Sequence, residues 1–244
     1  MKETSTMSKR AIVLSGGKGT RLRPYTVVLP KPLMPIGEYP ILEIVIRQLA
    51  RNGFDKITMA VNHQADLIQT FFGNGKKWGV SIDYSIEDKP LSTMGPLKLI
   101  RDLPENFLVM NGDILTDFNY RGFYDYHLKS KGIFTVAAHR KKHRSEYGVL
   151  EIDKSDRLTG FKEKPVVEYQ ISMGIYMANR KVLEHIPDDR PYGFDVLMMK
   201  LIEMGEPVSV CHHEGRWLDI GNPDDYNSAA EEFEKNKSKF LSER

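Results

Sequence analysis

The sequence predicts an α/β fold, a Rossmann-like doubly wound mixed sheet that is mostly parallel and carries a small antiparallel excursion. Three observations lead to this prediction. Strand-like and helix-like segments alternate through the first two-thirds of the chain, and strands separated by helices pair in parallel. A glycine-rich turn at residues 15–19 follows the first strand. Two short strands then flank a polar turn at residues 153–156, which indicates a hairpin.

Each element is predicted from the spacing of its apolar residues. Short runs rich in branched residues indicate strands, and apolar residues at helical spacing indicate helices. Gly53 marks the end of the first helix, and Pro223 suits the first turn of the last. The expected strands are 10–15, 56–61, 80–86, 106–111, 133–138, 148–152, 158–162, 172–177 and 207–212. The expected helices are 41–52, 64–72, 94–102, 123–131, 195–204 and 223–235.

The bulk composition predicts one globular domain. The chain has 244 residues, of which 41% are hydrophobic and 28% charged. We expect a disordered extension over residues 1–8, the domain over 9–236 and a tail over 237–244. A net charge of +2 argues against binding to nucleic acid. The single cysteine, Cys211, and the lack of an apolar run of about 20 residues favour a cytoplasmic protein with no membrane partner.

The loop at residues 15–22 has the chemistry of a phosphate-binding loop. Its glycines allow backbone N–H groups to approach an anion closely, and Lys18, Arg21 and Arg23 add positive charge. A dinucleotide fingerprint fails, because Leu22 stands where its third glycine is required. A P-loop fails as well, because the loop does not close with Gly-Lys-Ser/Thr. The loop therefore suits a triphosphate, but through a motif that is neither a dinucleotide fingerprint nor a P-loop.

The segment that follows stiffens the chain around Lys31, which lies between Pro30 and Pro32. The pattern Gly-Gly-x-Gly-Thr-Arg-Leu followed by Pro-Lys-Pro resembles the signature of the sugar-phosphate nucleotidylyltransferase family. Within that family it most resembles mannose and heptose 1-phosphate guanylyltransferases, and the resemblance extends from about Lys9 to Lys235. The matching residues are Gly16, Gly17, Gly19, Thr20, Arg21, Leu22, Pro24, Thr26, Pro30, Lys31, Pro32 and Pro35.

The resemblance implies that a nucleoside triphosphate and a sugar 1-phosphate react to give a nucleotide-sugar and pyrophosphate. The sugar phosphate attacks the α-phosphorus in line, so the protein aligns the reactants and absorbs charge. The implied catalytic residues are Arg21, for the leaving phosphates, and Lys31, for the α-phosphate and incoming phosphate. Asp113 and Asp219 are implied to hold Mg²⁺, an ion that prefers oxygen ligands. Asp113 also follows a central strand, where open α/β sheets place ligands.

The resemblance also implies a nucleotide site made by Leu14, Gly16, Gly17, Gly19, Thr20, Glu87 and Gly95. Residues 87–97 resemble the nucleobase segment, although Ser92 and Met94 depart from its usual glycine and alanine. Glu87 motivates a guanine hypothesis, because a carboxylate accepts from both N1–H and N2–H₂ of that base. Thymidylyl, uridylyl or cytidylyl transfer to a glucose-type 1-phosphate stays open as the alternative.

The motif at residues 161–165 resembles the sugar-binding Glu-Lys-Pro of the family. By this resemblance Glu163 accepts hydrogen bonds from sugar hydroxyls and Lys164 pairs with the sugar phosphate. Gly148 matches the glycine of the usual Tyr-Gly contact near the sugar. Ser172 stands where the family commonly has Asn, which leaves mannose, a heptose and glucose all open.

A catalytically silent regulatory subunit is the competing hypothesis. Such a protein should lose the loop arginine, the lysine or a metal carboxylate, and all of these are present here. The basic run at residues 139–144 is interpreted as a solvated connection, with attraction of anionic substrates as the alternative. The expected partners are the nucleoside triphosphate and the sugar 1-phosphate, and a homodimer is expected from the family.

Overall fold

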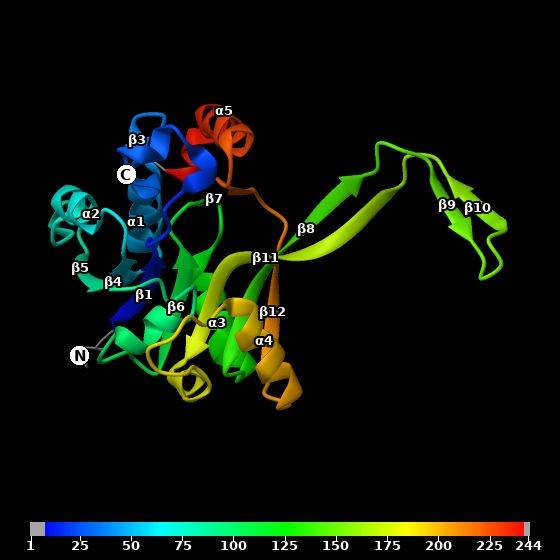
Figure 1. Cartoon of the computed structure of the whole chain (residues 1–244). Helices are drawn as coiled ribbons and strands as arrows, with labels where there is room; N and C mark the ends of the chain where they lie inside the picture. Colours follow the sequence, from blue (N-terminus) through cyan, green and yellow to red (C-terminus); the bar gives the residue numbers. More distant parts are fainter. Residues whose placement is uncertain (1–7, 242–244) are drawn as a thin grey trace.

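The computed structural model describes residues 8–241, and a seven-stranded mixed sheet forms their centre (Figure 1). The strand order is β12-β8-β11-β6-β1-β4-β5. Neighbouring strands pair in parallel except at β11, which runs antiparallel to both β6 and β8. The predicted fold class is therefore confirmed. Within the described part of the chain, no helix combines the length and apolar character needed to cross a membrane.

The elements have the following bounds. The strands of the main sheet are β1 (Lys9–Leu14), β4 (Phe54–Val61), β5 (Ser81–Ile86), β6 (Asn106–Asn111), β8 (Phe134–Arg144), β11 (Val166–Asn179) and β12 (Val208–His213). Three small antiparallel pairs are β2 (Pro35–Ile36) with β3 (Tyr39–Pro40), β7 (Ile114–Thr116) with β13 (Trp217–Asp219), and β9 (Val149–Ile152) with β10 (Leu158–Lys162). The α-helices are α1 (Ile41–Arg51), α2 (Ala65–Phe72), α3 (Tyr120–Ser130), α4 (Phe194–Glu203) and α5 (Pro223–Phe240).

The central strands are buried on both faces because helices cover both sides of the sheet. On β6, Phe107 and Val109 pack into one apolar cluster, while Leu108 and Met110 pack into the other. Successive side chains of a strand point to opposite faces, so a strand that is apolar throughout fits this place. The continuous apolar run of residues 106–111 thus marks the middle of the sheet, next to the strand that carries the glycine-rich loop.

Two of the predicted helices, 94–102 and 223–235, differ from the observed elements in type or in length. The helix expected at residues 94–102 is a short 3₁₀ segment, Gly95–Leu99, in which Pro96 has no N–H to donate. The last helix continues to Phe240 rather than ending at 235. Phe240 is fully buried and stacks against Phe233, so the first residues of the expected tail pack as part of the domain. Residues 1–7 of the expected extension lie outside the described residues.

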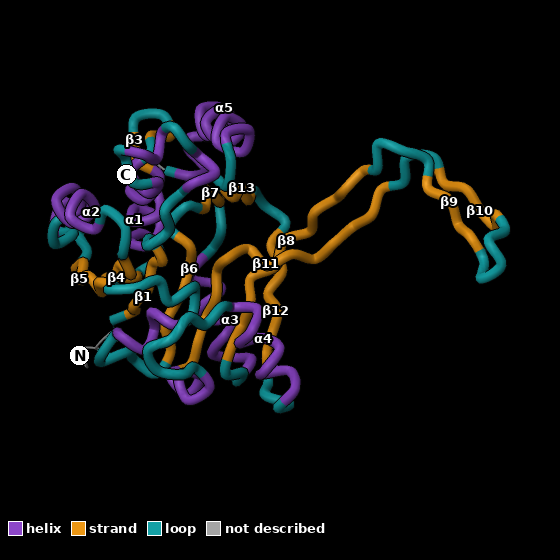
Figure 2. The backbone as a smooth tube through the Cα atoms, in the orientation of Figure 1, coloured by secondary structure: helices purple, strands orange, loops and turns teal. Residues whose placement is uncertain are grey.

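The largest difference is at β8 and β11, which are much longer than the expected strands 133–138 and 172–177. Both strands continue beyond the edge of the sheet as a two-stranded ribbon, and the β9–β10 hairpin lies at its outer end (Figures 1 and 2). The basic run at residues 139–144 forms the outer part of β8 rather than a loop.

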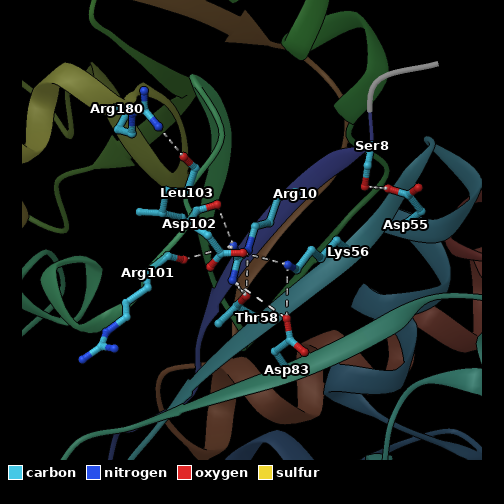
Figure 3. A network of polar contacts seen from close by, with 10 residues as sticks. All are labelled: Ser8, Arg10, Asp55, Lys56, Thr58, Asp83, Arg101, Asp102, Leu103 and Arg180. Atoms are coloured by element: carbon cyan, nitrogen blue, oxygen red, sulfur yellow. Dashed lines mark hydrogen bonds and ion pairs between the residues drawn. The ribbon is translucent and has the colours of Figure 1, made fainter. Parts of the chain in front are cut away.

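A polar network around Arg10 lies at the amino ends of β1 and β4, opposite the glycine-rich loop (Figure 3). The Arg10 side chain is buried, and its guanidinium donates to Thr58 Oγ1 at 2.8 and 2.9 Å and to Asp102 Oδ1 at 3.2 Å. Lys56 Nζ lies 3.6 Å from Asp83 Oδ2 and 3.2 Å from Asp102 Oδ2. Hydrogen bonds from Lys56 and Arg10 hold the pKa of Asp102 below its usual value. The network thus joins β1, β4 and β5 to the loop that carries Asp102 and stabilises this end of the sheet.

His127 should make the stability of the fold depend on pH. Its buried ring contacts Thr135 Oγ1 at 2.7 Å through Nδ1 and Asn106 Oδ1 at 3.1 Å through Nε2. An amide oxygen only accepts, so the neutral ring donates from Nε2 and accepts at Nδ1. Burial lowers the pKa of His127 to about 4. The unfolded chain takes up the proton near pH 6.5, so this contribution is complete above that pH and is lost towards pH 4.

The loss should reach about 3 kcal/mol of unfolding free energy between pH 6.5 and pH 4. In His127→Gln the slope of unfolding free energy against pH should be shallower in this window, as measured by urea denaturation at several pH values. His143→Gln, which replaces an exposed histidine, is the matched control and should keep the wild-type slope. Equal slopes for His127→Gln and the wild type would contradict the assignment.

Candidate active site

Two adjoining cavities lie where the glycine-rich loop meets the carboxyl ends of β1 and β6. The first is about 270 Å³ and the second about 320 Å³. They share Leu14, Gly17 and Asp113. The first is lined by Leu14, Ser15, Gly17, Gly19, Thr20, Arg21, Lys31, Pro32, Gly112, Asp113 and Gly221. The second is lined by Leu14, Gly16, Gly17, Asn62, Glu87, Pro90, Leu91, Ser92, Thr93, Pro96, Asn111 and Asp113.

The backbone of the glycine-rich loop requires glycine at two positions. Gly19 has φ of +59°, and a Cβ there would meet the Thr26 side chain at 3.0 Å. Thr26 in turn donates from Oγ1 to the carbonyl oxygen of Gly19 at 2.7 Å, which fixes the turn. A Cβ on Gly16 would lie 3.1 Å from Glu87 Oε1. The loop therefore lies close against the Glu87 side chain, and its residues line both cavities.

The four residues predicted to act on phosphate and metal come together here. Lys31 Nζ forms an ion pair with Asp113 Oδ2, and the Lys31 side chain is largely buried. Pairing of β13 with β7 places Asp219 opposite Ile114, one residue after Asp113. Arg21 lies across the first cavity, where a Cβ on Gly221 would be 3.3 Å from its Nη1. Segments that are far apart in the sequence thus form one charged site.

The two carboxylates fit a divalent cation. Burial raises the pKa of Asp219, and the negative charge of Asp113 raises it further, while Lys31 and Arg21 lower it. A cation between Asp113 and Asp219 would relieve this repulsion. Within residues 8–241 there is no group of three or more His, Cys, Asp or Glu side chains that could hold a metal. Two carboxylates with the remaining positions left for water and phosphate oxygens match the preference of Mg²⁺.

An additional polar group faces the same cavity. The Ser15 hydroxyl is buried and has no hydrogen-bond partner among the described residues. Buried polar groups in folded proteins are nearly always paired, so this hydroxyl is available to a water or a ligand in the cavity. A phosphate oxygen is a suitable acceptor for this hydroxyl. The residue was not singled out from the sequence, although it opens the glycine-rich loop.

Glu87 is buried beside the second cavity, as a base-binding residue requires. Its Oε2 accepts from the backbone N–H of Leu91 at 3.0 Å, while Oε1 faces Gly16. Burial raises the pKa of Glu87, and the hydrogen bond from Leu91 opposes this shift. Gly95, predicted to bind the nucleotide, lines neither cavity, and a Cβ there would meet Leu91 Cβ at 2.9 Å. Its lack of a side chain therefore serves packing of the segment that carries the cavity wall.

Asn62 is a site residue that sequence reasoning missed. It directly follows β4, lines the second cavity and donates from Nδ2 to the carbonyl oxygen of Glu87 at 2.6 Å. This hydrogen bond fixes the backbone that carries the Glu87 carboxylate. Its position could have predicted this role, because Asn62 is a polar residue at the carboxyl end of a parallel strand, as Asp113 is.

The predicted sugar-binding residues are not in either cavity. Gly148, Glu163 and Lys164 lie together at the outer end of the β8–β11 ribbon, where a Cβ on Gly148 would be 3.1 Å from Glu163 Oε2. Ser172 lies nearer the sheet, and its hydroxyl donates to the Tyr176 hydroxyl at 3.2 Å. The structure thus brings together the residues predicted for the nucleotide, apart from Gly95, with those predicted for the phosphates and the metal, and places the residues predicted for the sugar on a separate element.

The doubly wound sheet thus places a glycine-rich loop, an arginine, a lysine and Asp113 around one cavity, with Asp219 beside it, which is the arrangement expected of a site for nucleotide phosphates. Residues 10–236 match the family model described as nucleotidyl transferase, and the chain belongs to this family.

Named relatives differ in the base and the sugar. The chain is 34% identical over 238 residues to UTP–glucose-1-phosphate uridylyltransferase of Synechocystis sp., covering 89% of this chain and 61% of that one. It is 33% identical to D-glycero-α-D-manno-heptose 1-phosphate guanylyltransferase of Aneurinibacillus thermoaerophilus, covering 92% of this chain and 98% of that one. HddC of Yersinia pseudotuberculosis, solved in complex with GMP-PN, superposes with a TM-score of 0.71 at 26% identity, covering 92% of this chain and 99% of HddC. The chain spans about three-fifths of the length of the first curated relatives it matches.

Proposed function

We propose that this protein transfers a nucleotidyl group from a nucleoside triphosphate to a sugar 1-phosphate, giving a nucleotide-sugar and pyrophosphate. The observation that carries the proposal is that Arg21, Lys31 and Asp113 line one cavity beside the Glu87 cavity, with Asp219 close enough to interact electrostatically with all three. A triphosphate fits across the two cavities, with its phosphates beside the glycine-rich loop and its base beside Glu87. The presence of all four charged residues argues against a silent regulatory subunit.

The reaction needs no protein nucleophile, because the attacking phosphate is already an anion. An oxygen of the sugar 1-phosphate forms a bond to the α-phosphorus as the bond to the β-phosphate oxygen breaks. Arg21 stabilises charge on the departing pyrophosphate, and Lys31 aligns the α-phosphate with the incoming phosphate. When bound by Asp113 and Asp219, Mg²⁺ supplies Lewis acidity and neutralises phosphate charge. Lys31 must leave Asp113 for this role, so its ion pair with Asp113 belongs to the substrate-free enzyme.

We infer GTP as the triphosphate and mannose or a heptose 1-phosphate as the acceptor. Glu87 lines the second cavity, and within residues 8–241 its carboxylate accepts one hydrogen bond, from Leu91 to Oε2, which leaves lone pairs on both oxygens for the N1–H and N2–H₂ of guanine. The relative from Aneurinibacillus thermoaerophilus and the HddC complex with GMP-PN support this assignment. The relative from Synechocystis sp. supports uridylyl transfer to glucose 1-phosphate as the alternative.

The proposal is tested by measuring pyrophosphate release. The purified protein is incubated with each of the five common nucleoside triphosphates and with glucose, mannose or heptose 1-phosphate, in the presence of Mg²⁺. GTP with mannose or heptose 1-phosphate should give the highest kcat/KM. A preference for UTP or dTTP would overturn the base assignment and leave nucleotidyl transfer intact. No release from any pair would overturn the proposed reaction itself.

Glu87→Gln should lower kcat/KM for GTP by about 10- to 100-fold, because an amide provides one acceptor where guanine presents two donors. The same variant should affect UTP far less, since uracil gains nothing from a carboxylate at this place. Asp88→Asn removes a neighbouring exposed carboxylate and should leave the ratio of GTP to UTP unchanged. An unchanged ratio in Glu87→Gln would show that this carboxylate does not recognise the base.

A further inference from the structure

The β8–β11 ribbon and its terminal hairpin form an arm, defined here as residues 140–170. β8 pairs with β12 only as far as His139, so beyond that residue only β11 supports it. The ladder from Arg140–Gln170 to Arg144–Val166 keeps a regular register. At about 3.3 Å per residue, these five pairs carry the hairpin roughly 17 Å past the last position supported by β12. The arm therefore projects from the body of the molecule, as Figures 1 and 2 show.

The arm exposes apolar side chains that should be covered in solution. In the β9–β10 hairpin, Leu150 pairs with Phe161 and Ile152 with Leu158, so all four project from one face. Each is 57–63% exposed. Of the 23 large hydrophobic side chains exposed in the described chain, nine lie on this arm. A two-stranded hairpin is marginally stable alone, and such contiguous apolar exposure marks a protein–protein interface.

The outer end of the arm also carries two charged residues, Glu163 and Lys164, that have no polar contact with the body of the molecule among the described residues. Lys164 has φ of +43°, a strained conformation for a residue other than glycine, in the turn between β10 and β11. Within the described chain, the hydrogen bonds and ion pairs of residues 145–165 all join residues of that same segment. Glu163 and Lys164 are thus held in place without any partner in the body of the molecule.

The active-site cavities lack the groups that the arm carries. The phosphate cavity offers Arg21 and Lys31 to the triphosphate, but no residue of the arm lines either cavity. Beside Arg21, the side chains of Tyr25, Val27 and Val28 are 59%, 59% and 77% exposed. These three side chains belong to the segment between Arg21 and Lys31, so the stretch of chain that joins two residues of the phosphate cavity exposes apolar surface.

We propose that the arm serves a second copy of this chain, packing its apolar hairpin face on that copy and presenting Glu163 and Lys164 to the partner's sugar 1-phosphate. The proposal rests on the proposed function and adds that each complete active site is made by two chains. A cis arrangement would require the regular ladder of residues 140–144 and 166–170 to bend back over its own sheet. Exchange between two copies needs no such bend, and it covers the exposed apolar face of both arms.

The test is complementation between two inactive variants. Asp113→Asn removes a cavity residue and leaves the arm intact, while Lys164→Ala removes an arm residue and leaves the cavity intact. The two chains carry different affinity tags, are produced together, and are purified as heterodimers through both tags. One of the two sites then combines an intact cavity with an intact arm, so pyrophosphate release should return to about half of the wild-type rate. Each variant alone should stay inactive.

The mass of the protein in solution is the second readout, measured by light scattering after size-exclusion chromatography. The wild type should be a dimer, and Leu150→Glu with Ile152→Glu should shift it to a monomer. Glu151→Gln, on the opposite face of the same hairpin, is the matched control and should stay dimeric. A monomeric wild type, or a heterodimer no more active than its two parents, would overturn arm exchange. A wild type inactive on every substrate pair would refute the proposed function. The mass of the Leu150→Glu, Ile152→Glu variant would still test whether the arm makes the dimer contact.

Discussion

Asp113→Asn is expected to reduce turnover by about 1,000-fold, equivalent to about 4 kcal/mol of transition-state stabilisation. The carboxylate lies in both cavities, next to Asp219, and in the free enzyme it pairs with Lys31. Its loss removes one of the two charges available to a divalent cation. Steady-state pyrophosphate release at saturating substrates measures the effect, and a chelator should abolish wild-type activity reversibly.

The matched control is Asp117→Asn. Asp117 is four residues away and partly buried, but it pairs with Arg216 and His213 and lines neither cavity. It should keep most of the wild-type turnover. Thermal melting of both variants separates loss of function from loss of fold. Full activity in Asp113→Asn without any divalent ion would refute the metal assignment.

Lys31→Met is expected to lower kcat by about 100- to 1,000-fold with a much smaller change in KM, because its charge serves the transition state. The same substitution should strengthen Mg²⁺ binding to the substrate-free protein. In the free enzyme the Lys31 ammonium already neutralises Asp113, and a cation has to displace it. Kinetics and calorimetric Mg²⁺ titration of the free protein measure the two effects, which have opposite directions.

Lys18→Met is the control for charge in the same region. Lys18 belongs to the glycine-rich loop, but it is exposed and lines neither cavity. It should alter KM for the triphosphate modestly and leave Mg²⁺ binding unchanged. A rise in KM without a fall in kcat for Lys31→Met would assign this lysine to substrate binding rather than to the chemical step.

Sequence reasoning predicted the parts of the fold whose local pattern agrees with their final environment. Residues 106–111 are apolar throughout and form the doubly buried β6, and residues 41–52 have helical spacing and form α1. The charged site was predicted because the segments around Arg21 and Lys31 resemble the family signature, and because Asp113 also follows a central strand. Asn62 could have been found by the same rule, since it follows β4, but an asparagine in a short turn carries little signal by itself.

The arm could not be predicted because its residues look like a solvated connection. The run at residues 140–144 is basic and polar, and strands are usually recognised by apolar alternation. Its pairing with residues 166–170 joins positions more than 20 apart along the chain. The apolar residues of the hairpin were visible in the sequence, but the register shift between Ser172 and Tyr176, at the base of the arm, has no local sequence signal.

The site is divided into two cavities, and most of the residues that line one cavity do not line the other. Under the proposed function, residues 15–31, Asp113 and Asp219 act on the phosphates, whereas residues 87–96 and Asn62 select the base. The two groups meet only at Leu14, Gly17 and Asp113. Exchange of the 87–96 segment between relatives should therefore retarget an enzyme to another nucleoside triphosphate while the phosphate chemistry is inherited unchanged. Such a separation agrees with the names of two relatives at 33–34% identity, one a uridylyltransferase and the other a guanylyltransferase.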